Sequence, residues 1–219
     1  GADSLHATTL GREGSDYSAA IFAYALDAES VSIWKDVPGV LNADPRAFPN
    51  AEWLPKISYK EAIELAYYGA SVIHPKTVQP LQNKKIPLYV KSFVDPDSPG
   101  TLISDDNSED ARTPAFIIKH NQRLISLATK DFSFIAEEHL SHIFRVFGEH
   151  GITMNMMQNS AINFSVSVDE DDLKLAGLVK ELQQDYEVRY NQALDLLTIR
   201  HFNDEIVAEL TKGRTRLLE

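Results

Sequence analysis

Residues 8–16 read TTLGREGSD, and an apolar run from Ala19 to Leu26 follows them. The pattern predicts the end of a strand, a turn, and a helix that begins at Ser15. Gly11 and Gly14 allow a positive φ and a close approach of the backbone to a ligand. Because a helix start presents free N–H groups and the positive end of the dipole, this turn is suited to bind an anion. An ordinary turn with an aspartate cap explains the same residues.

A second loop, residues 35–46 (KDVPGVLNADPR), follows the apolar segment Val31–Trp34, which we expect to be a short buried strand. Pro38-Gly39 is a turn signal, and Pro45 disfavours a helical conformation of Asp44. Two aspartates and an arginine in one loop are suited to bind a nucleotide. They are equally compatible with solvated turn residues.

The next segment predicts two helices and a strand. Ser58 and Glu61 form a capping-box pattern at the start of a helix that ends at Gly69. Pro75 can begin another helix, and residues 87–93 (PLYVKSF) alternate like a strand. This alternation of helices and strands favours an α/β domain with a mostly parallel sheet.

Together these motifs resemble the aspartate kinases of the amino-acid kinase family. The family pattern is close to TTLGRGGSD, then I-x-TDVxGVxxxDPR, then ISYxEAxELAxxGAKVLHP. The present sequence reads TTLGREGSDYSAA at 8–20, IWKDVPGVLNADPR at 33–46 and ISYKEAIELAYYGASVIHPKTV at 57–78. The resemblance covers residues 8–104 and keeps the family order and separations.

The resemblance implies transfer of the ATP γ-phosphoryl group to the β-carboxylate of L-aspartate, with ATP and Mg²⁺ as cofactors. This reaction forms 4-phospho-L-aspartate, the first step toward lysine, threonine and methionine. The lysine-bearing KFGG-type loop that opens the family's kinase domain does not occur in this sequence. We therefore expect the chain to be the C-terminal part of such an enzyme and to be inactive alone.

The resemblance also assigns residues to this reaction. Asp16 matches the aspartate at the phosphoryl-transfer centre, and Arg12 and Ser15 match positions that bind the substrate aspartate. Positions around the nucleotide are matched by Lys35, Asp36, Leu41, Arg46 and Ser71. A surface ion pair is the alternative explanation for Arg46. Lys35 replaces a family threonine and Ser71 a family lysine, so one hypothesis is that Lys35 supplies the cation that Ser71 lacks.

The second half of the sequence predicts a different domain. Strand and helix patterns from residue 122 to about 192 follow the order βαββαβ, a ferredoxin-like unit. By position, the resemblance makes this an ACT regulatory domain. The expected domains are a C-terminal part of the kinase domain (1–104), a linker (105–113), an ACT region with flanking strands of a second ACT unit (114–202), and the start of a truncated second ACT segment (203–219). Separate strands are expected at Phe116–Ile118, Leu124–Ala128, around Val188 and Tyr190, and at Leu194–Arg200.

The resemblance implies an amino-acid feedback effector and a homodimer formed through the ACT region. Effector contacts are expected from the loop Phe132–Leu140 and from Asn155, Gln158, Asn159 and Ser160. A polar hairpin rim explains these four residues equally well. A non-catalytic ACT module that binds an amino acid and dimerises is the alternative function for the chain.

Composition excludes several other classes of protein. Lysine and arginine number 21 against 32 aspartates and glutamates, so the formal charge is −11. This charge argues against nucleic-acid and anionic-membrane partners. There is no cysteine, hence no disulfide or thiolate metal site, and a cytoplasmic protein is expected. His139, His142 and His150 lack the spacing of a ligand motif, so we expect surface residues and no metal site.

Overall fold

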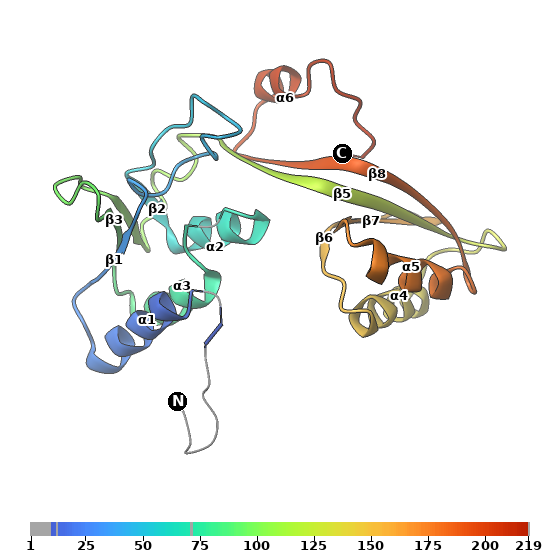
Figure 1. Ribbon diagram of the computed structural model, residues 1–219, viewed down its shortest axis with the longest axis horizontal. Helices are drawn as coiled ribbons and strands as arrows, with labels where there is room; N and C mark the ends of the chain where they lie inside the picture. The colour runs from blue at the N-terminus through green and yellow to red at the C-terminus, as the bar shows by residue number, and fades with distance from the viewer. Residues whose placement is uncertain (1–9, 12, 71, 219) are drawn as a thin grey trace. The chain divides into compact units, whose positions relative to one another are not determined.

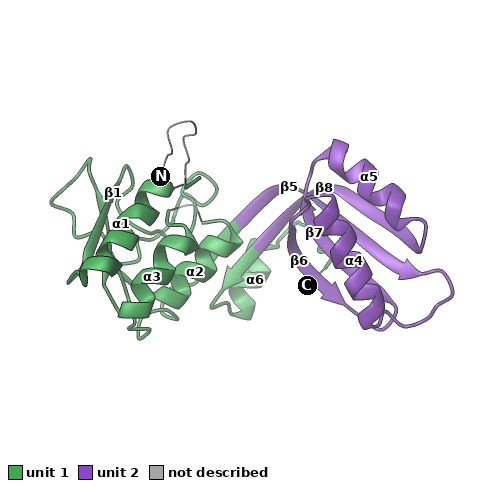
Figure 2. Ribbon diagram, turned by 90° about the horizontal axis from the view of Figure 1, so that it is seen from below, with its two compact units in different colours: residues 1–117, 198–219 green, residues 118–197 purple. Residues whose placement is uncertain are grey.

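The computed structural model describes residues 10–11, 13–70 and 72–218 of the chain (Figure 1). The predictions for Arg12 and Ser71 lie outside the described residues. The chain forms two compact units: unit 1 contains residues 1–117 and 198–219, and unit 2 contains residues 118–197 (Figure 2). Unit 2 is therefore inserted between two segments of unit 1. Within the described part, no helix combines the length and the apolar character needed to cross a membrane.

Unit 1 is a mixed α/β structure around a four-stranded sheet of order β1-β3-β4-β2. The pairs β1–β3 and β2–β4 are parallel, and β3–β4 is antiparallel, so the expected mostly parallel sheet is confirmed. Val78, Leu81, Leu88, Val90 and Ile103 form its fully buried centre. The elements are α1 (Gly14–Leu26), β1 (Val31–Lys35), β2 (Lys56–Ser58), α2 (Tyr59–Tyr68), α3 (Pro75–Lys84), β3 (Leu88–Ser92), β4 (Thr101–Ser104) and α6 (Asp204–Leu210).

The start of α2 corrects the capping-box prediction in one respect. Ser58 is the N-cap, and its Oγ accepts a hydrogen bond from the Glu61 amide at 2.9 Å, as predicted. The reciprocal bond is absent among the described contacts, because the Asp110 carboxylate accepts the Ser58 N–H at 2.7 Å. The Glu61 carboxylate binds Arg200 instead. Residue 110, expected in a linker, thus caps a helix of unit 1.

Unit 2 has the predicted βαββαβ order. A sheet of order β6-β7-β5-β8 carries the two helices, and the pairs β5–β7 and β6–β7 are antiparallel. Its core includes Ile125, Ile143, Phe147, Phe164 and Leu178, all buried. The elements are β5 (Ala115–Thr129), α4 (Glu137–Glu149), β6 (Met154–Asn159), β7 (Asn163–Asp169), α5 (Asp172–Leu182) and β8 (Tyr186–Arg200).

The four strands expected in this region are present, but the prediction that they are separate is wrong, because they merge into two long strands. Phe116–Ile118 and Leu124–Ala128 are both parts of β5, and the last two candidates are both parts of β8. Asn121 and Ala193 take the left-handed conformation, each with φ 55°, inside these long strands. Each strand therefore continues through a local irregularity that the sequence pattern indicated as a break.

Candidate functional site

The N-terminus of α1 lies where the sequence predicted an anion-binding turn. The helix begins at Gly14, and its N-cap Glu13 has a φ of 57° without a side-chain capping bond. A non-glycine residue is uncommon in this region of φ. The predicted start at Ser15 with an aspartate cap is wrong by one residue. Asp16 is instead in the first turn, with 9% of its surface exposed.

The structure brings two predicted site residues together here. The Lys35 Nζ atom, at the end of β1, lies 2.6 Å from Asp16 Oδ2. Their side chains are only 21% and 11% exposed, so water screens this ion pair weakly. Ser15 is exposed, and its Oγ lies 3.5 Å from Asp16 Oδ1. A cation, a carboxylate and the N-terminus of a helix thus meet at one point.

The second loop is anchored at its base and exposed at its tip. Thr101 Oγ1 accepts the Val40 N–H at 2.8 Å and donates to the Leu54 carbonyl at 2.7 Å. A Cβ atom added to Gly39 would lie 2.6 Å from Thr101 Oγ1, so this close approach requires glycine. Leu41 is half-buried and pairs with Trp53 through a β-bridge.

Asp36 and Arg46 are exposed residues of this loop. The Arg46 guanidinium binds Asp44, with its terminal nitrogen 2.7 Å from Asp44 Oδ2. This side-chain hydrogen bond lowers the pKa of Asp44 and raises that of Arg46. The surface ion pair is therefore the observed contact of Arg46. Among the contacts found for the described residues, none joins Asp36, Leu41 or Arg46 to the Asp16–Lys35 pair.

The predicted effector residue Asn155 is engaged inside unit 2. Its Nδ2 donates to Gln122 Oε1 at 2.9 Å and to Asp169 Oδ1 at 2.8 Å, and its Oδ1 accepts from Lys119 at 2.9 Å. Gln122 is only 1% exposed while Asp169 is exposed, so this polar network runs from the interior of unit 2 to its surface. The strand register shifts at Asn155, which points its side chain into the cluster.

The other three predicted effector residues lie at the exposed end of the β6–β7 hairpin. Gln158 and Asn159 are exposed residues of β6. Ser160 closes the turn: its N–H donates to the Asn163 carbonyl at 2.8 Å, and its Oγ accepts the Asn163 N–H at 3.2 Å. The Ile135 N–H donates to the Ala161 carbonyl at 2.8 Å. The two segments predicted to form an effector site are thus adjacent within one chain.

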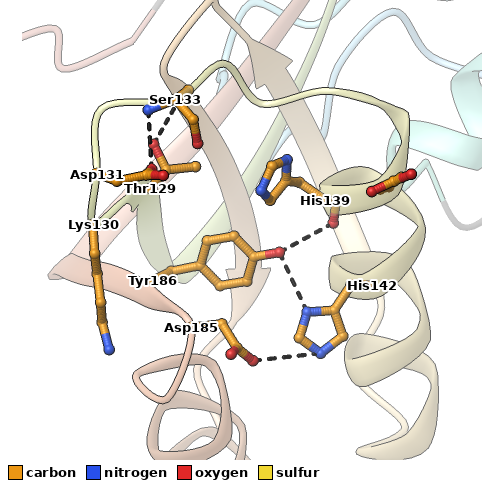
Figure 3. A pocket seen from close by; sticks show the side chains of 9 residues that line it. Thr129, Lys130, Asp131, Ser133, His139, His142, Asp185 and Tyr186 are labelled. Atoms are coloured by element: carbon orange, nitrogen blue, oxygen red, sulfur yellow. Dashed lines mark hydrogen bonds and ion pairs between the residues drawn. The ribbon is translucent and has the colours of Figure 1, made fainter.

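A pocket of about 500 Å³ is lined by the loop after β5, by α4 and by the start of β8 (Figure 3). Tyr186 stands in it between the loop before α4 and the first turns of α4. Its hydroxyl donates to the His139 carbonyl at 3.4 Å and lies 3.3 Å from His142 Nδ1, while the His142 ring stacks on the Tyr186 ring. Burial and the nearby Asp185 charge raise the pKa of Tyr186.

The sequence analysis did not find this pocket. The only signal was the spacing of His139 and His142, which puts them on one helix face. His150, the third histidine, binds Glu181 at 2.9 Å on the far end of α4. Within the described ranges, no group of three or more histidine, aspartate or glutamate side chains is arranged to hold a metal ion.

Comparison with known proteins shows which family this chain resembles. A model of the amino acid kinase family matches residues 1–92. Over 199 residues the chain is 33% identical to the lysine-sensitive aspartokinase 3 of Escherichia coli, covering 88% of this chain and 44% of that protein. The chain belongs to the aspartokinase family.

Two solved aspartokinases share the fold of this chain. The E. coli aspartokinase III complex with aspartate and ADP is 33% identical, with a TM-score of 0.71, over 87% of this chain and 44% of that one. The Clostridium acetobutylicum aspartate kinase is 27% identical, with a TM-score of 0.76, over 87% and 46%. This aspartokinase-family chain spans about half the length of the relatives it matches, and its fold class is the expected mixed α/β.

Proposed function

We propose that the full-length protein, meaning one that spans the length of these relatives, is an aspartate kinase. It transfers the γ-phosphoryl group of ATP to the β-carboxylate of L-aspartate. A β-carboxylate oxygen attacks the γ-phosphorus, the bond to the bridging oxygen breaks, and ADP and 4-phospho-L-aspartate leave. The observation that carries this proposal is the Asp16–Lys35 pair at the N-terminus of α1, in a chain of the aspartokinase family.

The residues of unit 1 contribute charge and position to this reaction. Phosphoryl transfer depends mainly on positioning and on neutralising the phosphate oxygens. The free N–H groups at the start of α1 and the Lys35 ammonium suit the phosphates. We assign Asp16 to the transfer centre, Arg12 and Ser15 to L-aspartate, and Asp36, Leu41, Arg46 and Ser71 to the nucleotide. Mg²⁺ would be held mainly by the phosphates, and Asp16 would supply a carboxylate beside them.

We assign residues 114–202 to an ACT regulatory region that follows the kinase part (1–104) and a linker (105–113). The observed βαββαβ order and the strand order β6-β7-β5-β8 support a ferredoxin-like unit of the ACT type. The outer ends of β5 and β8 and residues 203–219 would belong to a second ACT unit. A soluble enzyme of the cytoplasm, controlled by an amino-acid effector, is consistent with these features.

The assignment of the two loops is tested by substrate affinities. In the full-length protein, Arg12→Ala should raise the KM for aspartate far more than the KM for ATP, because its fork matches a carboxylate. Arg46→Ala should do the reverse. Initial rates at varied aspartate and ATP give both constants for each variant. Equal effects on both constants would mean that the loops are misassigned. A wild-type protein without aspartate-dependent ATP turnover would refute the proposed aspartate kinase activity.

The second function is assembly, and exposed apolar residues favour it. β6 is an edge strand of its sheet, and Met157 on it is 48% exposed; Phe132 and Phe134 in the neighbouring loop are 82% and 72% exposed. We expect the chain to form a homodimer through this edge, with a sedimentation mass near twice 24.5 kDa at micromolar concentration.

A charged substitution on the edge strand β6 distinguishes a specific homodimer from nonspecific association. Met157→Lys should favour the monomer, because a charged side chain on an edge strand opposes its pairing with the edge of a second copy. Leu173→Lys is the matched control, since Leu173 is 91% exposed on α5. A wild-type chain that sediments as a monomer at micromolar concentration would contradict the homodimer.

A further inference from the structure

Two acidic side chains lie at the described start of α1. Glu13 precedes the helix and Asp16 lies in its first turn. The Glu13 Oε2 atom is buried and has no hydrogen-bond partner among the residues that the structure describes. A helix dipole supplies only about half a positive charge at this end. Two carboxylates therefore outweigh the dipole, and a polyphosphate would be repelled unless a cation neutralised them.

Lys35 is placed to be that cation. Its Nζ atom lies 2.6 Å from Asp16 Oδ2, and both side chains are largely buried. The contact is an ion pair rather than an aligned hydrogen bond, because no described residue gives Asp16 Oδ2 a hydrogen bond of standard geometry. An ammonium group has three N–H donors, so donors remain for a phosphate oxygen. Lys35 is also the last residue of β1, and ligands of α/β sheets bind beyond the carboxyl ends of strands.

We propose that Lys35 is a positioning residue that acts through Asp16. It holds the Asp16 carboxylate and neutralises its charge, so that the polyphosphate of a nucleotide can bind at the N-terminus of α1. This inference rests on the proposed nucleotide-binding function of the same site. It adds that nucleotide affinity depends on the coupling of the two side chains rather than on a lysine–phosphate contact alone.

The binding of ADP to the full-length protein tests this role without requiring turnover. Lys35→Met should weaken ADP binding by at least about tenfold, because an unpaired, poorly solvated carboxylate then faces the phosphates. Lys35→Arg keeps the charge and should restore most of the affinity. Lys91→Met is the matched control: Lys91 lies on the neighbouring strand β3, and its amine is 5.5 Å from the centre of the Trp34 ring. It should leave ADP affinity unchanged.

A double-mutant cycle isolates the action through Asp16. In an Asp16→Asn background the carboxylate charge is gone, so Lys35→Met should cost much less ADP affinity than in the wild type. An equal cost in both backgrounds would show a direct phosphate contact and overturn the proposal, as would wild-type affinity in Lys35→Met. Thermal unfolding of each variant checks that the fold persists. A wild type that binds ADP but does not phosphorylate aspartate would refute the reaction and leave this inference standing.

Discussion

Replacing Asp16 by asparagine should lower the kcat of the full-length protein by about a thousandfold, the loss typical when one preorganised charge is removed from a transition state. Asp16 is buried at the start of α1 and pairs with Lys35. An asparagine keeps the size of the side chain, but it carries no charge to hold the Lys35 ammonium in place during phosphoryl transfer. Steady-state rates with saturating ATP and aspartate measure the change.

A second aspartate on the same helix provides the control. Asp27 follows the last turn of α1 and binds Lys84, with 77% of its side chain exposed. Asp27→Asn should leave kcat within the error of the wild type, because exposed ion pairs contribute little. If Asp16→Asn retained a tenth of the wild-type kcat, Asp16 could not be at the transfer centre.

Removal of the Glu61 carboxylate should destabilise the chain by about 3 kcal/mol, because breaking a buried ion pair leaves the other charge without a partner. Glu61 is 5% exposed, and Arg200 binds both of its oxygens, at 2.8 and 2.7 Å. His201 Nε2 lies 3.2 Å from the same carboxylate. Urea unfolding of Glu61→Gln against the wild type at neutral pH measures the loss.

The same carboxylate gives the stability a pH dependence. Burial alone would raise the pKa of Glu61, but the hydrogen bonds from Arg200 and the nearby His201 ring outweigh it and lower the pKa. A lowered folded-state pKa stabilises the fold above the unfolded value of about 4.3 and loses that contribution as pH falls through the folded value. The difference between wild type and Glu61→Gln should therefore shrink in acid.

Two further variants sharpen this test. Glu64 also contacts Arg200, at 3.2 Å, but its side chain is 36% exposed, so Glu64→Gln should cost much less than Glu61→Gln. The double variant Glu61→Leu/Arg200→Leu removes both charges and should be more stable than either single variant. The single variants for this comparison are Glu61→Leu and Arg200→Leu. If the double variant were less stable than both, the stabilising free energy would come from packing rather than from the ion pair.

Local patterns in the sequence were sufficient for the elements but not for their distant partners. The period of apolar residues predicts α4 because Ile143 and Phe147 recur on one face. The polar stretch Lys119–Arg123 instead suggested a break in β5. Its side chains are satisfied by partners far along the chain: Gln122 binds Asp169, and Arg123 binds Glu170, both in or next to β7.

The same limit applies to the candidate site. Asp16 and Lys35 were both predicted as site residues, but their pairing depends on β1 and α1 packing in unit 1. Glu61 fits a local capping rule, yet Arg200 takes its carboxylate from 139 positions away. The spacing of His139 and His142 did not suffice to predict the pocket around Tyr186, because the end of β5 with the loop after it, α4 and the start of β8 supply its residues from separate segments.

The insertion of unit 2 has a consequence for how such proteins diversify. Its chain enters through β5 and leaves through β8, and these two strands are neighbours in one sheet. An insertion whose ends lie together can be excised and replaced by a tight hairpin without stretching the host. A recombination event at this junction would exchange unit 2, the proposed regulatory unit, for another unit, while the elements of unit 1 keep their order. If the proposed function holds, two such proteins can share a closely similar unit 1 and still respond to different effectors.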